Sequence, residues 1–131
     1  MPGVVVYLLY AGLWYGNVRF VLGRLREELD AMDNPRALVF DADGTSDIDY
    51  TAARQVEQFI DFLKGRGIAF GLARASHLVH HDLKHSGLLK HLGPGNLFSS
   101  VQEAVQALAP KDATDSAQPS RPEGVSDPGE R

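Results

Sequence analysis

The segment ALVFDADGTSDID, residues 37–49, constrains most strongly what this chain can fold into. Its apolar run at 37–40 leads directly into an acidic stretch, which is typical of a buried parallel strand that ends in a polar loop. Apolar side chains recur at helical spacing both before it, in 18–32, and after it, in 50–64. Because parallel strands need crossover connections that are usually helices, the pattern predicts an α/β domain.

The same alternation continues along the chain. Strands are expected at 4–9, 13–15, 37–41, 68–73 and 96–98, with 13–15 as a short partner of the first strand. Helices are expected at 18–32 after an Asn17 N-cap, at 50–64 after an Asp49 N-cap, from Ser76 or His77 to Gly87, and from a capping box that opens at Ser100. The right-handed crossover rule makes 37–41 and 68–73 neighbours in the sheet.

Composition indicates one domain followed by a tail. The 131 residues are 44% hydrophobic, which is enough for one packed core. Residues 110–131 contain Val125 as their only large aliphatic residue and are rich in Pro, Ser and Asp. Such a segment cannot bury enough apolar surface to offset its ordering entropy. We therefore predict a folded domain at 1–109 and a disordered tail at 110–131.

Charge and residue content exclude several classes of function. The net charge is −4 and the pI is about 5.6, so no nucleic-acid partner is expected. The absence of cysteine excludes disulfides and Cys-ligated zinc. The apolar run 4–15 covers about 12 residues and falls short of the ~20 that a bilayer span needs. The sequence therefore predicts a domain that is soluble when excised and does not insert into a membrane by itself.

One enzymatic alternative comes from residues 41–45, DADGT, which resemble the nucleophile loop of haloacid-dehalogenase phosphatases. That resemblance implies Asp41 as the nucleophile and Asp43 as the group that handles the leaving-group proton. The family also needs late carboxylates for Mg²⁺, and after Asp82 the next aspartate is Asp112, in the predicted tail. A motif counts only in its structural context, so we expect this match to be accidental and the protein not to be an enzyme.

A longer resemblance accounts for the same loop. Residues 48–52, IDYTA, follow a strand and enter a helix, as in the hydrophobic-Asp-x-[Ser/Thr]-[Gly/Ala] signature of STAS domains. The segments PGVVVYLLYAGLWYGN at 2–17, LKGRGIAFGLARAS at 63–76 and HSGLLKHLGPGNLFSSVQEAVQAL at 85–108 resemble other parts of that family in the same order. The opening segment resembles the branch found in SulP-type sulfate and anion transporters, although Leu8 stands where Arg is usual.

The resemblance implies a fold and a role. The expected fold is a STAS-type α/β domain, similar to anti-sigma-factor antagonists, with a central mixed sheet of about four to five strands and about four helices. The implied function is that of a non-enzymatic regulatory domain on the cytoplasmic side of the membrane. It would belong to a secondary transporter of anions, with sulfate as the expected anion. Its expected partners are the transmembrane domain of the same polypeptide and a regulatory protein. The alternative is a free-standing anti-sigma-factor antagonist that is switched by phosphorylation at Thr51.

The resemblance also implies candidate site residues. The antagonist phosphosite corresponds to Thr51, in the first turn of a helix, where a phosphate would meet free N–H groups; packing or capping is the simpler role for this threonine. No cofactor is required, with weak guanine- or adenine-nucleotide binding as an option at the carboxyl ends of two neighbouring strands. The residues implied for that site are Asp49, Tyr50, Thr51, Ala52, Arg74 and Ser76. Arg74 has a structural alternative, an ion pair with Asp43, Asp47 or Asp49, and we expect that pairing.

Five histidines between 77 and 91 suggest a further chemistry. His77, His81 and His85 are spaced four residues apart, and two such imidazoles can bind Zn²⁺ or Ni²⁺. The expected buried side of this helix carries Val79 and Leu83, which leaves the histidines facing water. The sequence therefore predicts a solvated histidine face and no metal site, with pH sensitivity as a lesser alternative.

Overall fold

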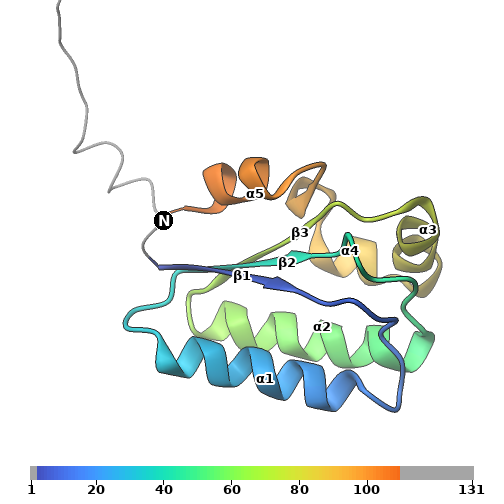
Figure 1. Ribbon diagram of the computed structural model, residues 1–131, viewed down its shortest axis with the longest axis horizontal. Helices are drawn as coiled ribbons and strands as arrows, with labels where there is room; N and C mark the ends of the chain where they lie inside the picture. Colours follow the sequence, from blue (N-terminus) through green and yellow to red (C-terminus); the bar gives the residue numbers. More distant parts are fainter. Residues whose placement is uncertain (1–2, 110–131) are drawn as a thin grey trace, which may run out of the picture.

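The computed structural model describes residues 3–109, so the predicted tail 110–131 lies outside the described residues. The chain alternates strands with helices, as the sequence predicts (Figure 1). The elements are β1 (Val4–Leu8), α1 (Val18–Ala31), β2 (Ala37–Asp41), α2 (Tyr50–Gly65), β3 (Ala69–Ala73), α3 (His77–Ser86), α4 (Leu88–Leu92), a 3₁₀ turn (Pro94–Asn96), β4 (Leu97–Phe98) and α5 (Val101–Leu108).

The four described strands form a sheet in the order β1-β2-β3-β4, with every neighbouring pair parallel. The predicted adjacency of 37–41 and 68–73 is confirmed, because β2 pairs with β3 from Ala37 opposite Ala69 to Asp41 opposite Ala73. The carboxyl ends of β1, β2 and β3 therefore lie along one edge of the sheet.

The predictions of a mixed sheet and of a strand at 13–15 beside the first strand are wrong. Leu13 forms a single parallel bridge with Ile48, and its backbone exchanges hydrogen bonds with the chain just before α2. Its N–H donates to the Asp47 carbonyl at 2.7 Å, and its carbonyl accepts from the Asp49 N–H at 2.9 Å. The Leu13 side chain is buried, so it is held under the start of α2 rather than turned back along β1.

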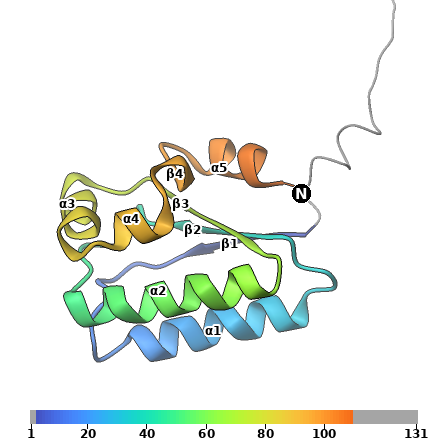
Figure 2. The same ribbon diagram turned by 180° about the vertical axis from the view of Figure 1, so that it is seen from behind.

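Helices cover the two faces of the sheet unequally. In Figures 1 and 2, α1 and α2 lie along one face, α5 lies over the other, and α3 and α4 pack beside the strand ends. The larger core lies between the sheet and the α1–α2 layer and includes Leu25, Leu29, Leu38, Phe59 and Leu63. A smaller core joins Val39, Ala73 and Ala104 on the α5 face. Five α-helices are described where about four were expected, because 88–92 closes a short helix of its own.

The helix caps follow the sequence in three of four positions. Asp49 accepts the Ala52 N–H at 2.7 Å, Ser76 accepts the Val79 N–H at 3.1 Å, and Ser100 accepts the Glu103 N–H at 3.0 Å. The prediction that Asn17 caps α1 through its side chain is wrong. Its carboxamide instead binds the Trp14 N–H and the Gly12 carbonyl, so it fixes the preceding loop.

Candidate functional site

An ion pair between β2 and the end of β3 lies at the carboxyl edge of the sheet. Asp41 ends β2, and its side chain is 7% exposed, whereas the Arg74 side chain is 41% exposed. The Arg74 Nε donates to Asp41 Oδ1 at 3.0 Å, and Nη2 donates to Oδ2 at 2.8 Å, which is the two-pronged geometry that favours Arg–carboxylate pairs. Asp43 adds a weaker contact, with its Oδ2 3.6 Å from Arg74 Nη2.

These contacts set the charge state of the pair. The hydrogen bonds from Arg74 lower the pKa of Asp41 below its ordinary value of 3.8, against an opposing effect of burial, and the Asp43 N–H lowers it further. The same hydrogen bond raises the pKa of Arg74. Both groups are therefore charged at neutral pH, and the carboxylate has both oxygens occupied by one guanidinium.

Arg74 has an uncommon backbone conformation. Its φ is +61°, a left-handed value that a non-glycine residue seldom adopts without support from its surroundings. Two contacts supply that support: the ion pair with Asp41, and the Arg74 N–H, which donates to the Phe98 carbonyl at 3.0 Å. This strained backbone lies directly after the last residue of β3, so we regard the turn at Arg74 as part of the candidate site.

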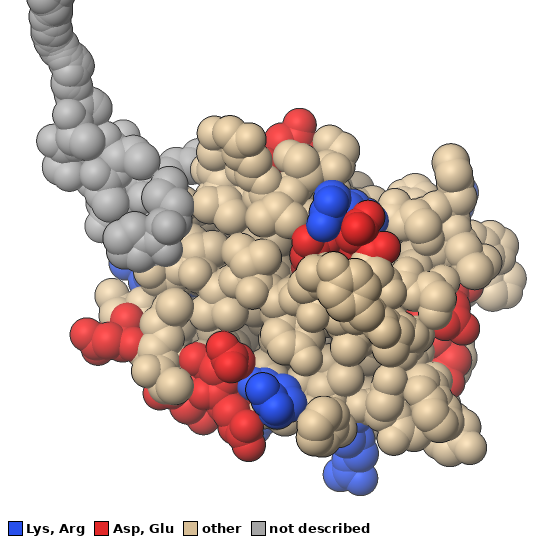
Figure 3. All heavy atoms as spheres, viewed as in Figure 1, with Lys and Arg blue, Asp and Glu red and all other residues tan. Residues whose placement is uncertain are grey.

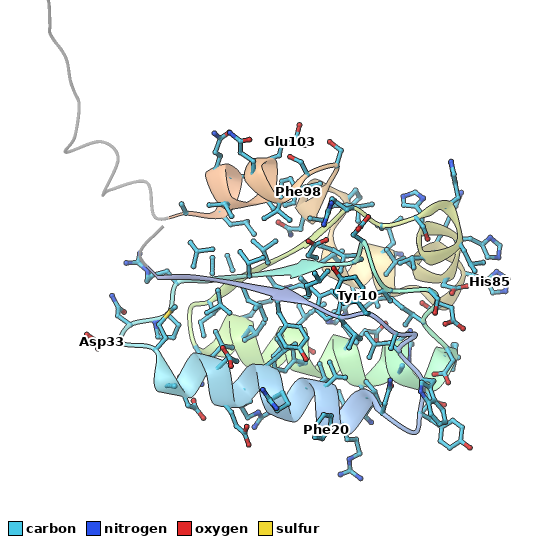
Figure 4. All side chains as sticks on the ribbon, in the orientation of Figure 1. Tyr10, Phe20, Asp33, His85, Phe98 and Glu103 are labelled. Atoms are coloured by element: carbon cyan, nitrogen blue, oxygen red, sulfur yellow. The ribbon has the colours of Figure 1, made fainter. Side chains whose placement is uncertain are left out.

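A surface hollow of about 420 Å³ adjoins Arg74. Its lining combines the guanidinium with apolar and weakly basic side chains, namely Arg74, Ala75, His80, Leu97, Phe98 and Ser99. Figure 4 shows the labelled Phe98 on the α5 side of the molecule. The α5-facing core contains Val39, and Asp41 follows it in strand alternation, so the ion pair lies on this same side of the sheet.

The start of α2 forms a second group at the same edge. The Asp49 carboxylate accepts the Ala52 N–H through Oδ1 and the Tyr15 N–H through Oδ2, at 2.7 and 3.0 Å. Tyr50 and Thr51 are exposed and Ala52 is buried. The Asp82 carboxylate of α3 accepts the Ile48 N–H at 3.0 Å and thereby ties α3 to this loop.

The predicted site residues therefore divide into groups. Asp49, Tyr50, Thr51 and Ala52 surround the start of α2, whereas Ser76 caps α3 and Arg74 turns toward Asp41 on the α5 side. Within residues 3–109 no hydrogen bond or ion pair joins Arg74 to the α2 group. The expected pairing of Arg74 with Asp43 is present. Asp47 and Asp49 do not pair with Arg74, and its principal partner, Asp41, was not foreseen.

This arrangement does not suit a phosphate at the start of α2. The carboxylate of Asp49 already occupies the Ala52 amide and places negative charge where the phosphate would lie. At α3, Ser76 occupies the Val79 amide in the same way. Among the predicted site residues Arg74 is the cationic one, and it lines a hollow, but its Nε and Nη2 are directed at Asp41 and its Nη2 also lies 3.6 Å from Asp43 Oδ2.

The histidine face agrees with its description as solvated. His77, His81 and His85 are exposed, and the rings of His81 and His85 stack with centroids 5.4 Å apart (His85 is labelled in Figure 4). No cluster of three or more His, Cys, Asp or Glu suited to a metal ion occurs in the described part of the chain. Likewise, no helix between residues 3 and 109 is long and apolar enough to cross a membrane.

Comparison with known proteins places the chain in a family. The family model described as the STAS domain matches residues 1–104, so the chain belongs to the STAS domain family. It is 30% identical over 111 residues to Probable sulfate transporter Rv1739c of Mycobacterium tuberculosis, a match that covers 82% of this chain and 20% of that protein. The chain thus spans about a fifth of the length of the sulfate transporters that it matches.

Solved structures support the same fold. The crystal structure of a sulfate transporter family protein from Wolinella succinogenes has a TM-score of 0.70 at 22% identity, covering 86% of this chain and 89% of that one. A proposed anti-sigma factor antagonist from Thermotoga maritima has a TM-score of 0.71 at 14% identity, covering 84% and 91%. At these identities the likeness concerns the fold alone. It confirms the predicted STAS-type, antagonist-like fold class.

Proposed function

We propose that this chain is the cytoplasmic regulatory domain of a SulP-type secondary transporter of an inorganic anion such as sulfate. The observation that carries the proposal is the match to a sulfate transporter over 82% of this chain but only 20% of the relative. The relatives and structural neighbours named above are a sulfate transporter, a sulfate transporter family protein and a proposed anti-sigma factor antagonist, which supports a non-enzymatic role. The domain acts by contact with the transmembrane part of the same polypeptide or with a regulatory protein.

Cell fractionation with an antibody against residues 3–109 tests this proposal. Because the chain spans 20% of the relative, the expected result is a membrane-bound band about five times heavier than 14.3 kDa. A soluble band near 14.3 kDa would contradict it. Uptake of labelled sulfate by cells that express the full native polypeptide then tests the anion, with a deletion of residues 3–109 as the matched variant.

The second candidate is an antagonist switched by phosphorylation at Thr51. One observation favours it: Thr51 is exposed in the first turn of α2, so a kinase can reach the hydroxyl. Mass spectrometry of the protein isolated from its native cells tests this candidate. Phosphate on Thr51 in a soluble protein of native length 131 residues supports the antagonist, and an unmodified Thr51 under all growth conditions removes it.

Nucleotide binding remains a prediction, and its best location is the hollow beside Arg74. A guanidinium and the Phe98 ring line that hollow, and such groups suit a phosphate and a base respectively. Affinity should be weak, because Asp41 already occupies two N–H groups of Arg74. Calorimetric titration with GTP and ATP tests it. We expect the weak binding to be lost in Phe98→Ala and kept in Thr51→Ala. Binding that is kept in Phe98→Ala and lost in Thr51→Ala would place the nucleotide site at the start of α2 instead.

A further inference from the structure

The α1 surface carries exposed aromatic and basic side chains that the proposed function does not use. We define it as Trp14, Tyr15, Arg19, Phe20, Arg24 and Arg26, from the loop before α1 and the first nine residues of that helix. The three aromatic side chains are 48%, 70% and 69% exposed for Trp14, Tyr15 and Phe20. Figure 4 shows the labelled Phe20 on the outer side of α1, away from the sheet.

The charges of α1 oppose its own dipole. Arg19, Arg24 and Arg26 lie in the first nine residues of the helix, whereas its acids, Glu27, Glu28 and Asp30, lie in the last five. A helix is stabilised by acids near its start and by bases near its end, so this distribution costs stability. In Figure 3 acidic groups gather at the lower left, on the side where α1 ends in Figure 1, with a basic group beside them, and a further basic group projects from the lower edge.

The three arginines are available to an external anion. Within residues 3–109 none of them has a carboxylate within salt-bridge distance. Arg26 is held in place by its guanidinium carbon, which lies 3.9 Å from the centroid of the Phe62 ring. The Asp49 carboxylate accepts hydrogen bonds from the backbone amides of Tyr15 and Ala52. The surface therefore presents three positive charges on a chain whose net charge is −4.

A hollow between α1 and α2 lies among these residues. Its volume is about 220 Å³, and its lining is Arg19, Leu22, Gly23, Arg26, Gln55, Gln58 and Phe59. A Cβ atom built on Gly23 would meet no atom within 4 Å beyond its chain neighbours and the backbone of its own helix, so the hollow is open beside Gly23. Two guanidiniums and two carboxamides above an apolar floor suit a phosphodiester headgroup, whose oxygens accept hydrogen bonds.

We propose that the α1 surface binds an anionic phospholipid bilayer, with a headgroup phosphate between Arg19 and Arg26 and with Trp14, Tyr15 and Phe20 in the interfacial layer. Tryptophan and tyrosine favour that layer because they combine an apolar ring with a polar edge. Helices that lie on membranes likewise pair basic residues with exposed aromatics. The acids at the end of α1 would be repelled, so the domain meets the bilayer with the start of α1 foremost.

Trp14 is the only tryptophan of the chain and reports on this contact directly. The 131-residue chain is mixed with vesicles of phosphatidylcholine alone or with 30 mol% phosphatidylserine, and Trp14 emission and co-sedimentation are followed. A blue shift and co-sedimentation are expected with the anionic vesicles only, weakening as salt is raised. Absence of both, or equal binding to neutral vesicles, would overturn the proposal and leave the surface to a protein partner.

Two double variants distinguish a specific contribution of the α1 surface from a general effect of the net charge. Arg19→Gln combined with Arg26→Gln should weaken vesicle binding about 30-fold, from the usual contribution of a basic residue near an anionic bilayer. Arg36→Gln combined with Lys90→Gln removes the same charge from exposed positions elsewhere and should change binding little. Equal losses in the two double variants would overturn the proposal. Circular dichroism confirms that each is folded, and cell fractionation tests the transporter proposal separately.

Discussion

Arg74 donates two hydrogen bonds to Asp41 across the ends of β3 and β2, at 3.0 and 2.8 Å, while its own backbone holds a left-handed φ of +61°. The residues are 33 positions apart in the chain and are brought together because Asp41 lies opposite Ala73 in the parallel register. The pair therefore connects the two central strands to the turn that leads into α3. We expect its removal to lower the free energy of unfolding more than it affects ligand binding.

The first prediction concerns acid stability. Arg74 lowers the pKa of Asp41 in the folded protein below the ordinary value of 3.8. The stabilisation is therefore present above the unfolded pKa and is lost as pH falls below it through the native pKa. The free energy of unfolding, measured by urea denaturation, should fall more between pH 7 and pH 3 in the wild type than in Asp41→Asn. Asp47→Asn, at an exposed loop position, should retain the wild-type pH dependence; a flattened dependence there would contradict the assignment.

The second prediction separates the strain at Arg74 from its ion pair. Arg74→Ala and Arg74→Gly both remove the guanidinium, but only glycine adopts a φ of +61° without a steric penalty. Calorimetry should give a higher melting temperature for the glycine variant than for the alanine variant, with both below the wild type. An equal melting temperature for the two would show that the backbone at 74 relaxes once the ion pair is gone.

The third prediction concerns the phosphatase alternative. Asp41 is 5% exposed, and both its oxygens accept hydrogen bonds from Arg74, so it is poorly placed to attack a phosphorus atom. Incubation of the purified protein with Mg²⁺ and p-nitrophenyl phosphate should give no turnover above buffer, and Asp41→Asn should give the same rate. Hydrolysis that Asp41→Asn abolishes would restore the enzymatic interpretation.

The periodicity of the sequence was enough to predict the four strands of the described sheet and most of the helices, but not that every neighbouring pair of strands is parallel. The run 37–40 is buried on both faces, as an all-apolar strand should be, and the side chains of Asp49, Ser76 and Ser100 cap helices as expected. The prediction of a strand at 13–15 was wrong because the backbone N–H and carbonyl of Leu13 form their hydrogen bonds with the distant loop at 47–49. A local propensity for extended structure carries no information about which distant segment will supply the partner.

The site was harder to predict, although one signal was available. Once 37–41 and 68–73 are neighbouring parallel strands, Asp41 and Arg74 lie at the same edge, and alternation from Val39 places Asp41 on the α5 face. Only Asp43, Asp47 and Asp49 were considered as partners of Arg74, and so its pairing with Asp41 was missed. The contribution of Phe98 and Ser99 to the hollow depends on how β4 and α5 return over the sheet, which no local pattern reveals.

The fourth prediction concerns the start of α2. Asp49→Ala removes the acceptor of the Ala52 and Tyr15 amides and should lower the unfolding free energy by about 1–2 kcal/mol, as lost N-caps do. Thr51→Ala alters an exposed side chain and should change it by less than about 0.5 kcal/mol. Chemical denaturation measures both. A larger loss for Thr51→Ala than for Asp49→Ala would show that the hydroxyl has a structural role.

The last prediction uses one substitution at two glycines. In Gly71→Ala the new Cβ would lie 2.6 Å from Leu108 Cδ1 and 2.9 Å from Phe98 Cε2, so these two side chains must shift to make room for it. Such overpacking should destabilise the fold by about 1–3 kcal/mol. In Gly23→Ala the Cβ meets no other atom within 4 Å and lies inside α1, where alanine should stabilise the helix by roughly 0.5–1 kcal/mol. Thermal unfolding should therefore give a lower melting temperature for Gly71→Ala and a higher one for Gly23→Ala than for the wild type. If Gly71→Ala were neutral, the side chains of Leu108 and Phe98 would be packed more loosely against β3 than their distances from the Gly71 Cβ position indicate.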